Sequence, residues 1–340
     1  MKSSSGKSAS PAKSTASNGM VAPAIYQNDP RLWAAWLYYN DELNQNQIAT
    51  LLGVSRATVV NYLQEARANH YIRISVRHDL LTSVNLAQKL KEIFGLRDCM
   101  VIPDDGGLLS PTQRIGKAGA SFMEGTLNPD DVVGVAWGRT VQALADNLVE
   151  QSMSNLCVVQ VMGSQSGATD GFSSEECVSL MSLKLRAKTA HLHAPATLSN
   201  KELRDALRKE AIIQEQFARI RSCTKLLFGV CSVKENSLVF ASGLTNVEES
   251  KYYITKGAVG VICGRFYDGK GNWIEGPLDD RLMGISLDDV KNIPTRIAVA
   301  GGTEKTSSIL GALRGGYINT LITDTKTALN ILENLPSDLL

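Results

Sequence analysis

The stretch NQIATLLGVSRATVVNYLQEAR, residues 46–67, decides the fold of the first part of this 340-residue chain. Ile48, Leu51 and Leu52 form the apolar face of one short predicted helix. Gly53 ends that helix, because glycine adopts a left-handed backbone conformation at little cost. Ser55 is a good N-cap for a following helix, in which apolar residues recur at helical spacing. The stretch therefore predicts two helices joined by a tight turn.

Flanking segments extend this helix pair into a small domain. Asp29 and Pro30 are typical of a helix start, and the apolar residues that follow at helical spacing predict a helix that runs to about Glu42. The segment from Tyr71 to Val76 alternates with a period of two and predicts a strand. Three helices and a strand give the outline of a winged helix-turn-helix domain over residues 25–79.

Charge and composition distinguish the two ends of the chain. Residues 1–78 carry a net charge of +4 and residues 79–340 a net charge of −3, so a basic head precedes a mildly acidic body. Residues 1–24 are rich in Ser, Ala and Lys and contain no acidic residue, which is typical of a disordered tail.

Cysteine usage and hydropathy favour a cytoplasmic protein. The six cysteines are scattered without a CxxC pair and lie mostly in apolar runs, which favours buried, reduced thiols. No stretch reaches the roughly 18 apolar residues that a membrane span requires, and the N-terminus lacks the apolar segment of a signal peptide. We therefore expect no membrane partner.

The chain beyond residue 80 follows a different pattern. One predicted helix within residues 80–97 connects the head to residues 98–340, where strands and helices alternate. Near-continuous apolar strands separated by helices predict an α/β domain with a doubly wound, mainly parallel sheet covered on both faces. The predicted strands are Cys99–Ile102, Val132–Trp137, Leu156–Met162, Thr189–Ala194, Lys225–Val230, Gly260–Cys263, Arg296–Ala300 and Ile318–Thr323.

The second helix of the head has the properties of a DNA-recognition helix. A helix held rigidly across another by a glycine turn can enter the major groove with its N-terminal residues toward base edges. Arg56 could pair with guanine and Asn61 with adenine. A helical hairpin used for packing, dimerisation or protein binding remains the alternative. The expected DNA-binding residues are Arg56, Ala57, Thr58, Asn61 and Tyr62 at the bases, with Gln45, Gln47 and Arg67 nearer the phosphates.

The block from Asp41 to Arg67 closely resembles the DNA-binding head of the SorC/DeoR family of bacterial sugar-responsive transcriptional regulators. Further motifs resemble that family's effector-binding domain, so the resemblance covers about residues 26–335. It implies a fold similar to sugar-phosphate isomerases and deaminases, and dimers that assemble into tetramers. The motifs are GVAWGRT at 134–140, AVGVICGRFYD at 258–268, DRLMGIS at 280–286, AVAGGTEK at 298–305 and GGYINTLITD at 315–324.

A glycine turn after the strand Val132–Trp137 is the first candidate for effector binding. Gly138 precedes a predicted helix, whose N-terminus presents free backbone N–H groups and the positive end of the helix dipole. Arg139 could add a charge and Thr140 a hydroxyl to hold a phosphate. Any parallel α/β unit has such turns, so a purely structural role stays open; the resemblance implies that a sugar phosphate binds here.

Four more residues are assigned to the effector site. Gly163 and Ser164 end another strand and could line the same crevice at the carboxyl edge of the sheet. The residues alone favour exposed loop charges for Asp268 and Lys305, whereas the resemblance implies that both contact the ligand's hydroxyls or phosphate.

An acid and an amine beside a sugar phosphate could in principle move protons. A sensor gains nothing by consuming its signal, however, so we expect no catalytic residue and no cofactor. His191 and His193 share one face of a strand but lack supporting ligands, so no metal site is expected. The alternative is a sugar-phosphate isomerase or deaminase-like enzyme with an accessory DNA-binding head.

The predicted function is that of a DNA-binding repressor of a carbohydrate or polyol catabolic operon. Its partners would be double-stranded operator DNA, a small sugar, polyol or sugar phosphate, and further copies of the same chain. The effector would act by favouring one arrangement of subunits over another and so move the DNA-binding heads.

Overall fold

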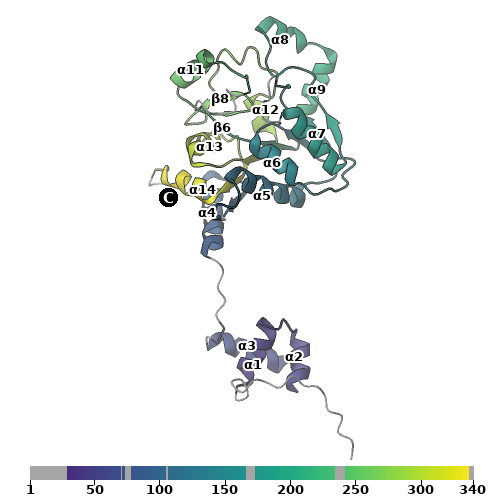
Figure 1. Cartoon of the computed structure of the whole chain (residues 1–340), viewed down its shortest axis with the longest axis vertical. Helices are drawn as coiled ribbons and strands as arrows, with labels where there is room; N and C mark the ends of the chain where they lie inside the picture. The colour runs from purple at the N-terminus through teal and green to yellow at the C-terminus, as the bar shows by residue number, and fades with distance from the viewer. Residues whose placement is uncertain are drawn as a thin grey trace, which may run out of the picture. The chain divides into compact units, whose positions relative to one another are not determined.

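The computed structural model describes residues 29–69, 71–72, 78–104, 106–165, 173–233 and 242–336. The chain divides into two compact units, Met1–Val76 and Arg77–Leu340 (Figure 1). The tail predicted for residues 1–24 lies outside the described residues. So does most of the strand predicted at Tyr71–Val76, of which Tyr71 and Ile72 are described and belong to no regular element. The wing of the head therefore stays a prediction.

Three helices make up the described part of the first unit. They are α1 (Pro30–Tyr39), α2 (Gln45–Leu52) and α3 (Arg56–Ala68). The Asp29 carboxylate caps α1 by accepting a hydrogen bond from the backbone N–H of Arg31 at 3.0 Å. All three helices contribute to one core, which consists of Trp33, Ala34, Ala35, Leu37, Ile48, Ala49, Val59, Leu63 and Ala66.

The turn between α2 and α3 has the predicted conformation. Gly53 adopts φ 66° and ψ 32°, a left-handed conformation that side chains disfavour. The Ser55 hydroxyl accepts a hydrogen bond from the backbone N–H of Thr58 at 3.0 Å and so caps α3. This turn fixes the start of α3 relative to α2.

Seven parallel strands form the central sheet of the second unit, in the order β1-β10-β9-β5-β2-β3-β4. The prediction of a mainly parallel α/β sheet is confirmed. Successive side chains point to opposite faces, so that Leu226 and Phe228 belong to one core cluster and Leu227 to the other. The strands are β1 (Asp98–Ile102), β2 (Val132–Val135), β3 (Cys157–Gln160), β4 (Lys188–Ala190), β5 (Lys225–Phe228), β9 (Thr295–Val299) and β10 (Thr320–Asp324).

Helices cover both faces of this sheet (Figure 1). One face packs against α5 (Pro111–Thr126), α6 (Arg139–Asn147) and α7 (Ser174–Leu185). The other packs against α4 (His78–Phe94), α9 (Ala211–Arg221), α13 (Thr306–Arg314) and α14 (Thr325–Glu333). The helix α4, predicted as a connector, packs against β1 and α14, so its described residues belong to the second unit.

A second, smaller sheet is antiparallel and consists of β6 (Cys231–Ser232), β7 (Ala258–Ile262) and β8 (Arg265–Asp268). Sequence reasoning grouped Gly260–Cys263 with the strands of the parallel sheet and missed β8 altogether. Cys263 and Gly264, with φ 49° and 73°, form the two-residue turn that returns the chain from β7 into β8. The short turn makes an antiparallel hairpin, because a parallel pair would need a long crossover.

The strand order of the large sheet reverses between β2 and β5. From β2 the chain moves to β3 and β4 on one side, whereas from β5 it moves to β9 and β10 on the other. In open α/β sheets such a reversal leaves a crevice outside the carboxyl ends of the strands, where ligands bind. Among the described residues, no helix is both long enough and apolar enough to cross a membrane.

Candidate functional site

A cavity of about 440 Å³ lies at this reversal point, a volume typical of small-molecule sites. Three strand ends supply most of its walls, namely the segments that follow β2, β5 and β9. The lining residues are Pro111, Thr112, Trp137, Gly138, Arg139, Thr140, Gly229, Val230, Cys231, Ser232, Gly301, Gly302, Glu304 and Lys305. We refer to this site as the carboxyl-edge cavity.

The N-terminus of α6 opens into the carboxyl-edge cavity. Gly138 precedes α6 with φ 146° and ψ 155°, and no side chain caps the helix. The first backbone N–H groups of an uncapped helix need partners, and the dipole favours an anion there. Thr140 is buried at the cavity wall, whereas Arg139 is exposed. This helix end therefore has the chemistry of an anion-binding site.

A buried carboxylate holds the loop that carries Lys305. Asp324, 4% exposed at the end of β10, accepts hydrogen bonds from the backbone N–H of Gly302 at 3.1 Å and from the Thr327 hydroxyl at 2.7 Å. The Gly302 N–H also reaches the Thr327 hydroxyl oxygen at 2.8 Å. A side chain at Gly301 would not fit, because its Cβ would lie 2.2 Å from the Asp324 carboxylate. Asp324 thus positions the loop without lining the cavity itself.

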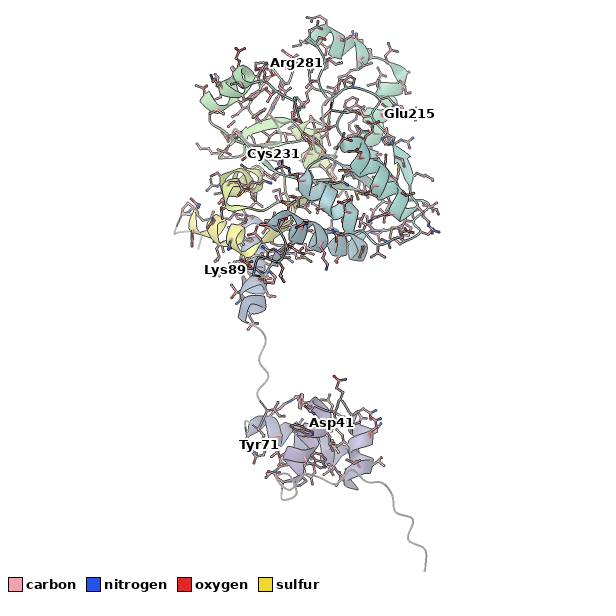
Figure 2. All side chains as sticks on the ribbon, viewed as in Figure 1. Asp41, Tyr71, Lys89, Glu215, Cys231 and Arg281 are labelled. Atoms are coloured by element: carbon pink, nitrogen blue, oxygen red, sulfur yellow. The ribbon has the colours of Figure 1, made fainter. Side chains whose placement is uncertain are left out.

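Cys231, which Figure 2 labels, lines the carboxyl-edge cavity together with Arg139 and Lys305. Burial raises the pKa of this thiol above its ordinary value, and the positive charges of Lys305 and Arg139 counteract that effect only in part. The thiol therefore stays neutral near pH 7.

The inner end of the carboxyl-edge cavity is apolar. A small cavity of about 20 Å³ adjoins it and shares Trp137, Gly229 and Cys231 with it. The other residues described around this recess are Ala136, Met162, Leu244, Val261, Cys263 and Gly264. Arg139 and Lys305 lie in the carboxyl-edge cavity but not in the recess, so the two together present a cationic end and an apolar end.

The exposed face of α3 carries most of the residues predicted to contact DNA. Arg56, Ala57 and Asn61 are exposed, and Thr58 and Tyr62 are half-buried. The Arg56 Nε atom donates a hydrogen bond to the Gln45 side-chain oxygen at 3.2 Å, which links α3 to α2. The Gln47 side chain accepts a hydrogen bond from the backbone N–H of Asn44 and so takes part in the capping box of α2. Arg56, Ala57 and Asn61 are open to a partner, whereas Tyr62 packs partly against the core of the first unit.

Comparison with known proteins agrees with this geometry. The Sugar-bind family model, which describes a sugar-binding domain, matches residues 78–333. The transcriptional regulator YjhU of Escherichia coli K12 is 36% identical over 311 residues, which cover 90% of this chain and 94% of YjhU. The deoxyribonucleoside regulator of Bacillus subtilis is 34% identical, covering 89% of this chain and 96% of that protein.

A solved structure extends the similarity to both units. The full-length sorbitol operon regulator SorC of Klebsiella pneumoniae superposes with a TM-score of 0.71 at 29% identity, covering 92% of this chain and all of SorC. This chain belongs to the SorC/DeoR family of transcriptional regulators. The predicted regulator function is confirmed, and these similarities are to regulators rather than to enzymes.

Four of the seven predicted effector residues of this SorC/DeoR regulator meet in the carboxyl-edge cavity, namely Gly138, Arg139, Thr140 and Lys305. Gly163 and Ser164 do not line it. The Gly163 N–H donates to the Met283 carbonyl at 2.8 Å, and the Ser164 hydroxyl donates to Glu175 at 3.0 Å. Both residues instead join β3 to neighbouring segments.

Asp268 is not brought to the carboxyl-edge cavity either. Its carboxylate accepts hydrogen bonds from the backbone N–H groups of Lys270 and Asn272 at 2.9 and 2.8 Å, and from the Asn272 side chain at 3.0 Å. Burial alone would raise the pKa of Asp268, but these hydrogen bonds hold it below the ordinary value. Asp268 therefore closes the turn after β8.

Sequence reasoning missed several residues of the site. Cys231 and Ser232 follow β5 as directly as Gly138 follows β2, so the same strand-end pattern could have identified them. Glu304 stands beside Lys305 in the quoted motif, and Asp324 ends another one. The role of Asp324 depends on contacts with Gly302 and Thr327 across two loops, which a linear pattern does not reveal.

Proposed function

We propose that this regulator binds operator DNA through α3 and that a sugar phosphate in the carboxyl-edge cavity changes the affinity of that binding. The observation that carries the proposal is the meeting of the open N-terminus of α6, Arg139 and Lys305 in one cavity at the reversal point of the sheet. These groups are donors and positive charges, which suit a phosphate.

The rest of the cavity suits the sugar part of such a ligand. The Thr140 and Ser232 hydroxyls and the Glu304 carboxylate can exchange hydrogen bonds with sugar hydroxyls. The cavity lining holds two cationic side chains and one carboxylate, so an anionic ligand is favoured over a neutral one. The effector class that fits best is a phosphorylated sugar or polyol.

Regulation would follow from differential binding. The protein would act in the cytoplasm as a homo-oligomeric repressor, a dimer or tetramer that matches a two-fold symmetric operator. Relatives named for deoxyribonucleoside and sorbitol regulation support a carbohydrate or polyol catabolic operon as its target. A coupling free energy of about 1–3 kcal/mol between effector and DNA would change operator occupancy several-fold to a hundredfold.

The deciding experiment measures the coupling directly. A duplex selected in vitro from random sequences with the wild-type protein serves as the operator, and fluorescence anisotropy follows its release during titration with a panel of sugar phosphates. Lys305→Ala should bind the duplex as the wild type does but lose the effector response. Lys188→Ala, which removes an exposed lysine of β4, is the matched control and should respond normally.

Two outcomes would contradict the proposal. If Lys305→Ala responded to the active sugar phosphate as the wild type does, the effector would bind elsewhere. If no duplex were enriched over random DNA, the role of α3 as a recognition helix would fail.

A further inference from the structure

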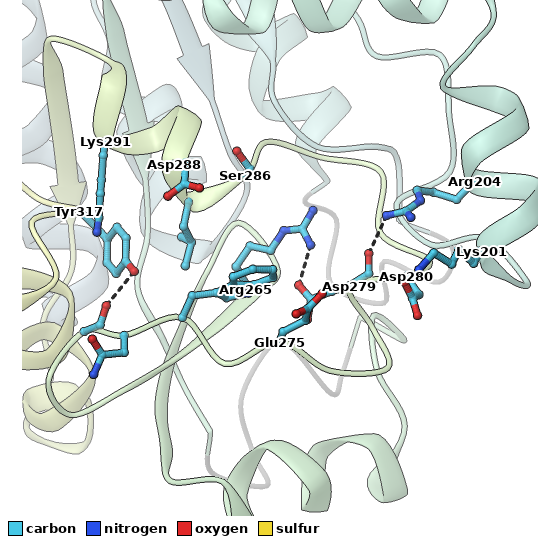
Figure 3. A pocket seen from close by; sticks show the side chains of 14 residues that line it. Lys201, Arg204, Arg265, Glu275, Asp279, Asp280, Ser286, Asp288, Lys291 and Tyr317 are labelled. Atoms are coloured by element: carbon cyan, nitrogen blue, oxygen red, sulfur yellow. Dashed lines mark hydrogen bonds and ion pairs between the residues drawn. The ribbon is translucent and has the colours of Figure 1, made fainter.

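A second cavity of about 480 Å³ lies in the Arg77–Leu340 unit and shares no lining residue with the carboxyl-edge cavity. Figure 3 shows Lys201 and Arg204, from α8 (Lys201–Leu207), on one side of it. Lys291, from α12 (Leu287–Asn292), and Tyr317 lie on the other side, with Arg265 between the two groups. Its lining residues are Lys201, Arg204, Arg265, Gly271, Asn272, Trp273, Glu275, Asp279, Asp280, Ser286, Leu287, Asp288, Lys291 and Tyr317.

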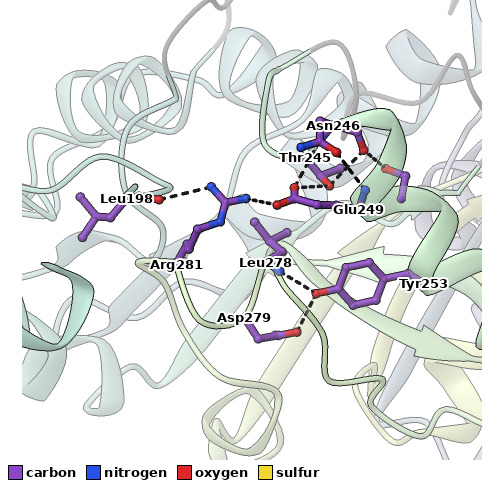
Figure 4. A network of polar contacts seen from close by, with 9 residues as sticks. Leu198, Thr245, Asn246, Glu249, Tyr253, Leu278, Asp279 and Arg281 are labelled. Carbon is purple, nitrogen blue, oxygen red and sulfur yellow. Dashed lines mark hydrogen bonds and ion pairs between the residues drawn. The ribbon is translucent and has the colours of Figure 1, made fainter. Parts of the chain in front are cut away.

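A buried ion pair forms one wall of this cavity. The side chains of Arg265 and Asp279 are 8% and 7% exposed, and Arg265 Nη1 donates to Asp279 Oδ1 at 2.6 Å. The other carboxylate oxygen accepts from the Tyr253 hydroxyl at 2.9 Å (Figure 4) and from the Gly276 N–H, also at 2.9 Å. The Asp279 carboxylate is thus fixed from three directions, and it orients Arg265.

Two arginines keep donors available to a ligand. The Arg204 Nη1 atom donates to the Asp279 backbone carbonyl at 3.0 Å, next to the Arg265 pair. For the Nη2 atoms of Arg204 and Arg265, the described residues supply no hydrogen-bond acceptor. Each guanidinium has five N–H donors, so these two nitrogens can still donate to a ligand. An acceptor group of a ligand in the cavity would satisfy them.

The charges around this cavity balance. Lys201 pairs with Asp280 at 2.9 Å, and Arg265 pairs with Asp279. Because the numbers of basic and acidic side chains are equal, an anion gains little here, in contrast to the carboxyl-edge cavity. The basic residues are Lys201, Arg204, Arg265 and Lys291, and the acidic ones are Glu275, Asp279, Asp280 and Asp288.

Aromatic rings complete the lining. Trp273 is 46% exposed, an unusual exposure for so large an apolar side chain, and the Lys291 Nζ atom lies 4.8 Å from the centre of the Tyr317 ring. An indole face offers apolar contact to the C–H groups of a sugar ring. Neighbouring arginines and carboxylates match hydroxyl groups, which both donate and accept hydrogen bonds.

We propose that this second cavity binds an unphosphorylated sugar or polyol. The proposal does not depend on the sugar-phosphate site, because the two cavities have no lining residue in common. The regulator would then take a charged ligand at one site and a neutral ligand of the same chemical family at the other.

Isothermal titration calorimetry on the full chain tests this assignment. The probes are glucose, ribose, sorbitol and maltose, together with ribose 5-phosphate and glucose 6-phosphate. At least one neutral probe should bind the wild type and Lys305→Ala with equal affinity. Its affinity should fall about tenfold or more in Trp273→Ala and in Asp288→Asn. Trp36→Ala, which removes a similarly exposed tryptophan (41%) from the first unit, should bind the neutral probe normally.

Several results would overturn the assignment. The second cavity is not a neutral-sugar site if no neutral probe binds the wild type, or if Trp273→Ala and Asp288→Asn bind as the wild type does. Loss of neutral-sugar binding in Lys305→Ala would show that the neutral ligand binds in the carboxyl-edge cavity instead. Sedimentation of the same variants is the last check. If the variants dissociate into subunits but still bind the sugar, the residues of the second cavity form an interface between copies of the chain and not a sugar site.

Discussion

Asp324 is a buried carboxylate that positions one loop of the carboxyl-edge cavity although its own side chain does not line that cavity. It receives hydrogen bonds from Gly302 and Thr327, and the loop from Gly301 leads directly to Lys305. The position of the Lys305 ammonium group therefore depends on an interaction one strand away. Replacement of Asp324 should disturb both stability and effector response.

Asp324→Asn is expected to lower the free energy of unfolding by about 1–3 kcal/mol, because both carboxylate oxygens accept hydrogen bonds and the amide nitrogen that replaces either one cannot accept. Urea unfolding measures the loss, and an effector titration should show weaker binding in the same variant. Asp130→Asn, at an exposed position, is the control. An unchanged unfolding midpoint in Asp324→Asn would contradict the positioning role.

Gly53 allows a second test at the scale of one residue. An added Cβ at Gly53 meets no atom within 4 Å, so any cost of Gly53→Ala comes from its φ of 66° alone. We expect a loss of about 1–2 kcal/mol in the stability of the head. Gly125→Ala in α5 also meets open space but at an ordinary φ, and should be neutral or slightly stabilising. Circular dichroism melts compare the two, and equal melting temperatures would argue against the left-handed turn.

At the scale of elements, variants of α3 test whether this helix recognises base sequence or only binds DNA in general. Arg56→Ala and Asn61→Ala should each cost about 1–3 kcal/mol on the selected duplex and much less on random DNA. Asn69→Ala removes an exposed amide at the other end of α3 and should leave discrimination intact. Anisotropy at fixed salt concentration measures both duplexes. An equal loss on the two would show that α3 contacts only phosphates.

A buried ion pair joins two strands at the opposite edge of the sheet. Asp131, just before β2, pairs with Lys225 of β5 and accepts a hydrogen bond from the Thr224 hydroxyl at 2.7 Å. Burial would raise the pKa of Asp131, but the hydrogen bonds from Lys225, the Asn128 N–H and Thr224 together lower it below the ordinary value. A carboxylate with a lowered folded-state pKa contributes stability above its unfolded pKa of about 3.9, and that stability is lost as pH falls through the folded-state value.

Asp131→Asn should therefore cost about 3–5 kcal/mol near neutral pH, because Lys225 would be left buried without its charge partner. The difference from the wild type should shrink as the solution is acidified. The double variant Asp131→Asn/Lys225→Met removes both charges and should recover much of the loss. Urea unfolding across the acid range measures all three proteins, and a pH-independent difference would contradict the assigned pKa direction.

At the scale of the whole molecule, the described core clusters do not mix residues of the two units. We therefore expect a fragment of residues 78–340 to bind the active sugar phosphate as the full chain does, while losing DNA binding. Calorimetry on the fragment and on the full chain compares the two affinities. A fragment that unfolds, or that binds the effector far more weakly, would show that the head contributes to the effector site.

Much of this architecture follows from the sequence, and the exceptions have physical causes. Gly138 was predictable because strand ends meet at one edge of a parallel sheet, and Lys305 was predictable only through the resemblance to the SorC/DeoR family. The position of Asp268 was not predictable, because a carboxylate after a strand can equally well accept hydrogen bonds within a turn. Asp268 accepts such bonds from Asn272. The strand β8 was missed because Cys263 and Gly264 are not a typical hairpin pair. The second cavity combines α8, the segment from Arg265 to Asp288 and Tyr317, whose proximity only the fold reveals.

The contrast between the cationic and apolar ends of the carboxyl-edge cavity has a consequence for how such regulators diversify. In the proposed binding mode, Arg139, Lys305 and the start of α6 would anchor the charged group, whereas Met162, Val261 and Cys263 line the adjoining recess. Substitutions in the recess can therefore change which carbohydrate is accepted while the grip on its charged group is retained. A regulator could then respond to a new carbohydrate through substitutions in the recess alone, while the residues that contact the charged group stay the same.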